Sequence, residues 1–162
     1  MTGIEIAEIA SADTLGGTLF RRRFGQEPPT FPHHVVAYAR DGGGTPAVAL
    51  CYVHFTPMGS VLLGGGACVD HRALRRLAPD VRNALHAQGG LYRTTLEWAV
   101  AHFAHDHDAI FGYCGDRLAE RIDLAAGFVR SGHSHLLVRW LREVEIARQQ
   151  ELIATVHALG AF

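Results

Sequence analysis

Residues 109–140 read AIFGYCGDRLAERIDLAAGFVRSGHSHLLVRW. The stretch opens with an apolar run, residues 109–113, that has the length and composition of a short buried strand. Asp116 can cap the helix that follows, and Gly127 can end that helix because glycine readily adopts the left-handed C-cap conformation. Two short β segments then flank Ser131-Gly132. The stretch therefore predicts a strand, a helix and a pair of strands in succession.

The sequence on either side of this stretch carries further strand and helix signals. We expect strands at residues 4–9, 34–40, 47–55 and 61–69, turns at 41–44 and 57–60, and helices at 12–24, 80–88, from 91 onward and at 144–159. Gly64-Gly65-Gly66 interrupts the fourth strand, as glycines do at a bulge or at a close backbone approach. The pattern predicts an α/β (α+β) fold with a mixed, mostly antiparallel central sheet, helices on both faces and a C-terminal helix.

The totals of the chain exclude several classes of protein. Its 162 residues, 48% hydrophobic and 19% charged, predict a single globular domain over residues 1–162. A net charge of −1 gives no field that would attract a polyanion, so we expect no nucleic acid partner. The apolar runs are too short to cross a bilayer and no leader segment is visible, which predicts a cytoplasmic protein with no membrane partner.

Two residue types limit the chemistry further. Lysine does not occur in the chain, which excludes a catalytic lysine or a Schiff base. Cys51, Cys68 and Cys114 are odd in number and lack a CxxC spacing, so they predict reduced thiols rather than disulfides or a zinc site.

The segment 109–140 resembles the second half of a domain of the GNAT superfamily of acyl-CoA-dependent N-acetyltransferases. Asp116 stands where that family commonly has asparagine, Ala119 matches its alanine, and Gly127-Phe128 matches the Gly-Phe pair that ends its helix. The resemblance covers residues 34–141, and it implies a GNAT-like sheet and transfer of an acyl group, acetyl above all, to an amine.

The resemblance also implies where acetyl-CoA or another acyl-CoA would bind as co-substrate. The strand end Ala67, Cys68 and Val69 would lie along the pantetheine arm, with Asp116 nearby. The pyrophosphate would bind the loop and first helical turn formed by Gln88, Gly89, Gly90, Leu91, Tyr92 and Arg93. Such a loop suits phosphate because a helix start has unpaired N–H groups and glycine lets the backbone approach the oxygens. The family's phosphate-loop pattern is kept here at one glycine only.

Asp123 occupies the position where many members of the family carry a tyrosine that acts as general acid. An aspartate with an ordinary pKa near ~4 is ionised at pH 7 and cannot donate a proton. Either Asp123 is protonated, or Tyr113 at the end of a central strand transfers the proton, or water does. His133 and His135 are candidates for the general base if they point into the cleft.

Three readings of function remain open from the sequence. The first is an N-acyltransferase that acts on a small-molecule or peptide amine, with no metal. The second is a GNAT-fold protein that binds an acyl-CoA or another ligand without transferring the acyl group. The third is a metal protein with ligands from His102, His105 and His107. The apolar positions of 144–159 can pack on their own sheet or on a second copy in a homodimer.

Overall fold

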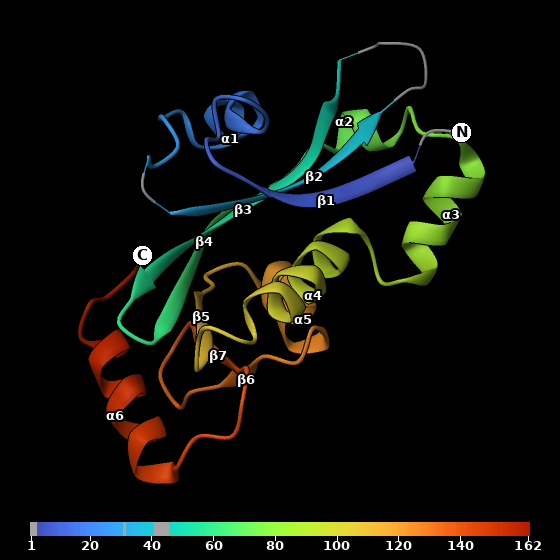
Figure 1. Ribbon diagram of the computed structural model, residues 1–162. Coiled ribbons are helices and arrows are strands. Elements are labelled where there is room, and N and C mark those ends of the chain that lie inside the picture. Colours follow the sequence, from blue (N-terminus) through green and yellow to red (C-terminus); the bar gives the residue numbers. More distant parts are fainter. Residues whose placement is uncertain (1–2, 31, 41–45) are drawn as a thin grey trace.

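The computed structural model describes residues 3–30, 32–40 and 46–162. Within these ranges seven strands form one sheet in the order β1-β2-β3-β4-β5-β7-β6, and helices flank it (Figure 1). The strands are β1 (Gly3–Ile9), β2 (His33–Arg40), β3 (Val48–Met58), β4 (Val61–Val69), β5 (Ala109–Tyr113), β6 (Val129–Arg130) and β7 (Leu136–Trp140). The helices are α1 (Gly17–Phe24), α2 (His71–Leu74), α3 (Pro79–Ala87), α4 (Leu91–Phe103), α5 (Arg117–Ala125) and α6 (Ile146–His157).

All neighbouring strands run antiparallel except β4 and β5, which are parallel. A parallel pair needs a crossover connection, and here the segment from α2 to α4 supplies it. The mixed, mostly antiparallel sheet predicted from the sequence is confirmed, and so is the C-terminal helix.

Successive side chains of the central strands point to opposite faces of the sheet. Leu62 and Ile110 point to one face, where α4 and the end of α5 complete a hydrophobic core. Their neighbours Leu63 and Phe111 point to the other face and pack against α6. Helix α1 covers β2 and β3 farther along that second face, and Figure 1 shows α1 and α6 near separate ends of the molecule. Among the described helices, α1 and α6 therefore cover different parts of the second face, α1 over β2 and β3 and α6 over β4 and β5.

One expected turn and the start of one expected strand differ from the structure, and a second expected turn cannot be compared. Strand β3 continues to Met58, so the turn expected at residues 57–60 is confined to Gly59-Ser60. Pro57 is tolerated in the strand because β2 pairs only as far as Phe55, so no partner on that side needs the missing N–H. His133 and His135 lie in the turn before β7 and not in a strand. The turn expected at residues 41–44 lies outside the described residues.

No helix in the described ranges has the length and hydrophobicity needed to cross a membrane.

Candidate functional site

The two parallel strands diverge in the middle of the sheet. Pairing between β4 and β5 starts at Val61 opposite Ala109 and ends at Gly64 opposite Gly112, whereas β4 continues to Val69. Beyond Gly64 the edge of β4 that would face β5 is therefore open.

A bulge in β4 accompanies this divergence. The register with β3 shifts between Tyr52 and His54, and Gly66 has a φ of 60°. A Cβ at Gly66 would lie 2.6 Å from atoms of both His54 and Phe20. Glycine is therefore required at this position by its conformation and by the lack of space, which explains part of the glycine run in β4.

Two adjoining hollows occupy the gap between the strands. The inner hollow, of about 330 Å³, lies where β4 and β5 separate, and the outer hollow, of about 610 Å³, extends from it to the start of α4. Both are lined by Arg23, Ala67, Tyr92, Asp116 and Ala119. The shared residues make one continuous cleft.

The start of α4 forms the far end of the outer hollow. Gly89 and Gly90 have φ angles of 87° and 95°, and the helix begins at Leu91 with no side-chain cap from the described residues. Thr94 is the first residue whose N–H bonds within the turn, to the carbonyl of Gly90 at 3.1 Å. The N–H groups of Leu91, Tyr92 and Arg93 have no backbone partner among the described residues and are the free donors of a helix start, beside the positive end of the helix dipole.

Asp123 of α5 points into the inner hollow and is only 6% exposed. The hydroxyl of Tyr92 from α4 donates a hydrogen bond to its Oδ1 at 3.0 Å. Burial raises the pKa of Asp123 to about 6, although the Tyr92 hydrogen bond acts in the opposite direction. Burial, followed by the charge of Asp123, raises the pKa of Tyr92 well above its ordinary value, so Tyr92 keeps its proton at neutral pH. An aspartate that holds its proton up to about pH 6 thus faces the point where the strands separate.

The structure brings together most of the residues singled out in the sequence. The outer hollow is lined by Ala67, Cys68, Val69, Gly89, Gly90, Leu91, Tyr92 and Asp116. The inner hollow is lined by both proposed catalytic residues, Asp123 and Tyr113. These two sets approach each other in space because α4 and α5 both begin beside the open part of β4.

Gln88 and Arg93 are the two exceptions. Gln88 lines a separate depression beside β1, on the other side of the α3–α4 turn. Arg93 forms an ion pair with Glu97 at 2.7 Å, and its side chain packs against Gly89. Neither residue lines the cleft: Gln88 is the C-cap of α3, and Arg93 is held by Glu97 along the surface of α4.

The thiols near the cleft are poor nucleophiles. Burial raises the pKa of both Cys51 and Cys68 to about 12. Burial also raises the pKa of Cys114, whose Sγ donates to the carbonyl of Asp116 at 3.2 Å. A thiol must lose its proton to attack, so these cysteines are suited to packing rather than to covalent catalysis.

Among the cleft residues that sequence reasoning missed are Arg23 and Phe24 at the end of α1, and Phe162 after α6. They lie far from the motif residues along the chain and reach the site only through packing on the second face. An arginine run at a helix end was the one signal available, and such a run is typical of an exposed surface.

The histidines do not gather at the cleft. The His133 ring stacks on that of His157 at a centroid distance of 3.7 Å, and His135 Nδ1 lies 3.1 Å from the carbonyl of Cys114. His102 contacts Glu8 at 2.7 Å. In the part of the chain that the structure describes, no group of three or more histidines, cysteines or acids is placed to hold a metal ion.

Comparison with known proteins yields matches only at the level of structure. No family model and no curated protein matches the sequence. The ribosomal-protein-S5-alanine acetyltransferase of Vibrio fischeri superposes with a TM-score of 0.57 at 10% identity, over 90% of this chain and 99% of that one. The ribosomal-protein-S18-alanine N-acetyltransferase of Escherichia coli gives 0.56 at 9% identity, over 89% and 97% of the two chains. The chain has the GNAT acetyltransferase fold.

A third solved structure extends the likeness to the GNAT fold. A putative acetyltransferase from Exiguobacterium sp. matches with a TM-score of 0.51 at 14% identity, covering 85% of this chain and 93% of the other. At such low identity the structural similarity establishes the fold, but it assigns no role to any residue. The chemistry must therefore be argued from the residues of this cleft.

Proposed function

We propose that the protein is an acyl-CoA-dependent N-acyltransferase that transfers an acyl group, acetyl above all, to an amine. The observation that carries the proposal is the continuous cleft from the diverging strands β4 and β5 to the uncapped start of α4. The GNAT fold, found in solved acetyltransferases, supports the same class of reaction.

The chemistry of the outer hollow suits an acyl-CoA. The open edge of β4 at Ala67, Cys68 and Val69 offers backbone groups to the amides of the pantetheine arm. The unpaired N–H groups at the start of α4 would bind the pyrophosphate, with Gly89 and Gly90 allowing close approach. The side chains of Gln88 and Arg93 play no part in this proposal, because neither residue lines the cleft.

The inner hollow would hold the reacting atoms. The amine nitrogen attacks the thioester carbonyl, so that a C–N bond forms and the C–S bond breaks. The ammonium formed on the acceptor loses a proton to water, and the leaving thiolate needs one. Asp123 is the proposed donor, because burial raises its pKa to about 6 and leaves a fraction of it protonated at pH 7. Tyr92 positions that carboxyl through its hydroxyl, and Tyr113 is the second residue to test.

A thermal shift measurement tests coenzyme binding. A ligand at about 100 times its dissociation constant adds roughly 2.7 kcal/mol to the free energy of unfolding. We therefore expect millimolar acetyl-CoA to raise the midpoint of this protein by several degrees. Leu118 lines the outer hollow and is 63% exposed, so a substitution there should leave the fold intact. Leu118→Glu should abolish the rise, because the new carboxylate would repel the phosphates of the coenzyme.

Ile146→Glu is the matched control. Ile146 is 72% exposed at the start of α6 and lines neither hollow, so its variant should keep the full rise. Equal rises in both variants would exclude the outer hollow as the coenzyme site. Gly90→Asp would also be expected to block binding. However, Gly90 has a φ of 95°, so a side chain there strains the backbone and makes the result ambiguous.

Binding without acyl transfer is the second candidate, favoured by the aspartate at the family's tyrosine position. Release of free thiol from acetyl-CoA against a panel of amines separates the two functions. Thiol release that depends on an amine supports the transferase, whereas saturable coenzyme binding with no thiol release supports a binding protein.

A further inference from the structure

Three consecutive arginines end α1, and their surroundings differ. Arg21 forms ion pairs with two carboxylates, at 2.7 and 2.6 Å. Arg22 forms one with Asp70 at 2.9 Å. Arg23 forms no ion pair with any carboxylate in the part of the chain that the structure describes. Its charge is therefore the one in this run that the protein leaves uncompensated.

The uncompensated charge faces the cleft. Arg23 lines the inner and the outer hollow, where the two join. Burial raises the pKa of the Cys68 thiol to about 12, and the positive charge of Arg23 acts against that rise, as expected for a guanidinium close to this part of β4. Arg23 is also the only lysine or arginine among the described residues that line the inner hollow.

Aromatic rings surround the same end of the cleft. Phe24 and Tyr113 line the inner hollow although they remain 41% and 36% exposed. The ring of Phe162 lies 6.1 Å from that of Tyr113, edge to face, and the guanidinium of Arg23 lies 5.9 Å from the ring of Phe24. Exposed rings that converge on a hollow are typical of a surface that binds an apolar group.

The two acidic residues of the inner hollow form no ion pair with Arg23. Asp116 is committed to capping α5, where its Oδ1 accepts the N–H of Leu118 at 2.8 Å. Asp123 is buried and holds the Tyr92 hydroxyl. A polycationic acceptor would meet the charge of Arg23, which no ion pair within the described ranges neutralises, so the electrostatics at this residue disfavour it.

We infer that the acceptor is an amine that carries a carboxylate and an apolar side chain, as an amino acid does, and that Arg23 binds the carboxylate. The inference rests on the proposed function and gives its substrate class. The rings of Phe24, Tyr113 and Phe162 form the apolar part of the acceptor site. The guanidinium fork suits a carboxylate because it can donate two parallel hydrogen bonds.

A matched pair of small molecules tests the inference without requiring turnover. N-acetylphenylalanine and N-(2-phenylethyl)acetamide share the amide and the aromatic ring, and differ in the carboxylate. We expect the protein to bind the first on the order of 10-fold more tightly, the effect of one charge-assisted interaction, in a ligand-observed NMR titration. Arg23→Gln should abolish the preference and leave the dissociation constant of acetyl-CoA within about twofold.

Arg22→Gln serves as the control, because it removes a neighbouring charge that is already paired with Asp70 and should leave the preference unchanged. Equal binding of the two molecules by the unaltered protein would overturn the inference. A Gln variant at residue 23 that binds acetyl-CoA more weakly but keeps the preference would also overturn it, and would assign Arg23 to the phosphates of the coenzyme. The preference without any acetyl-CoA binding would uphold the anion site and exclude the acyltransferase.

Discussion

Asp123 carries its carboxyl group in surroundings that oppose its ionisation. Burial raises its pKa from 3.8 to about 6, so the folded protein holds a proton that the unfolded chain has already lost. Below about pH 4 the carboxyl is protonated in both the folded and the unfolded state, so it costs no stability. The cost of the buried charge grows between about pH 4 and pH 6 and has its full value at higher pH. If Asp123 is the proton donor that we propose, function and stability make opposite demands on this residue.

Asp123→Asn should separate the two demands. The amide keeps an acceptor for Tyr92 without the charge, so we expect a gain on the order of 2–3 kcal/mol at pH 7.5 that disappears at pH 4. Thermal midpoints at the two pH values measure this gain. A variant less stable than the parent at pH 7.5 would show that packing outweighs the buried charge.

The pH dependence of turnover reports the role of the same carboxyl. If Asp123 donates the proton, kcat falls as the pH rises through about 6, and the Asn variant loses roughly 10²-fold in rate. A rate that instead rises through pH 6 would assign Asp123 as a base. Unchanged kcat in the variant would remove it from the mechanism.

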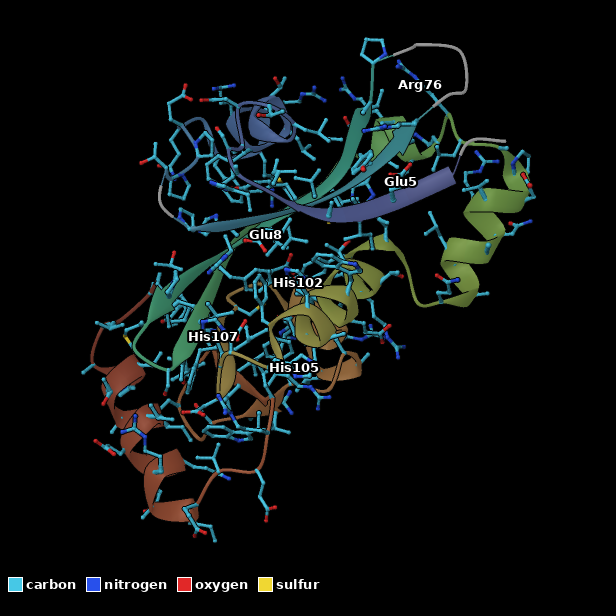
Figure 2. The ribbon with its side chains drawn as sticks, in the orientation of Figure 1. Glu5, Glu8, Arg76, His102, His105 and His107 are labelled. Atoms are coloured by element: carbon cyan, nitrogen blue, oxygen red, sulfur yellow. The ribbon has the colours of Figure 1, made fainter. Side chains whose placement is uncertain are left out.

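At the scale of elements, the carboxylate of Glu8 links strand β1 to strand β2 and to helix α4. Glu8 of β1 contacts His33 of β2 at 2.6 Å and His102 of α4 at 2.7 Å, and Figure 2 shows Glu8 beside the α4 end that carries His102. Partial burial raises the pKa of Glu8, but the hydrogen bonds and charges of the two histidines outweigh it and lower the pKa overall. The stabilisation is therefore present above the ordinary carboxyl pKa and is lost as the pH falls through the lowered value.

Glu8→Gln should cost under about 1 kcal/mol at pH 6, because the pair is partly exposed and solvent screens it. The difference from the parent should disappear near pH 3, which denaturant titrations at both pH values would measure. Glu143→Gln is the control, since Glu143 has no ion pair within the described ranges. An equal loss at both pH values would contradict the electrostatic explanation.

Substitutions in helix α6 test how strongly this helix packs on the second face of the sheet. Leu152 is 5% exposed and packs on β4 and β5, so Leu152→Ala should destabilise the protein by about 2–5 kcal/mol. Ile146→Ala, at an exposed position of the same helix, should change stability by less than about 0.5 kcal/mol. A small loss at Leu152 would mean that the helix is not held on its own sheet. Homodimer formation through α6 stays a prediction.

At the scale of the whole molecule, one sheet carries the cores of both faces. We expect a single cooperative unfolding transition over residues 1–162, because the central strands β4 and β5 contribute alternate residues to both cores. Differential scanning calorimetry should show one transition that acetyl-CoA shifts as a unit. Two transitions, with only one moved by the ligand, would contradict the prediction of a single domain.

Hydrophobic periodicity and turn residues determined most elements of this protein, because both depend on neighbours along the chain. The strand 109–113, the Asp116 cap and the helix end at Gly127 were all predictable in this way. The start of α4 was also recognisable, because Gly89-Gly90 interrupts the preceding helix and a new helical period begins at Leu91.

Only the tertiary structure decided which side chains meet in the cleft. The Tyr92–Asp123 hydrogen bond joins residues from two helices, and the pKa of Asp123 depends on how deeply α4 and α5 bury it. Gln88 lines a depression beside β1 and Arg93 pairs with Glu97, and both placements depend on how α3 and α4 pack. Arg23 and Phe162 reach the site because α1 and the segment after α6 flank the same gap on the second face. Local patterns predict which residues are buried, whereas the contacts between distant segments depend on strand order and helix packing, which no local pattern contains.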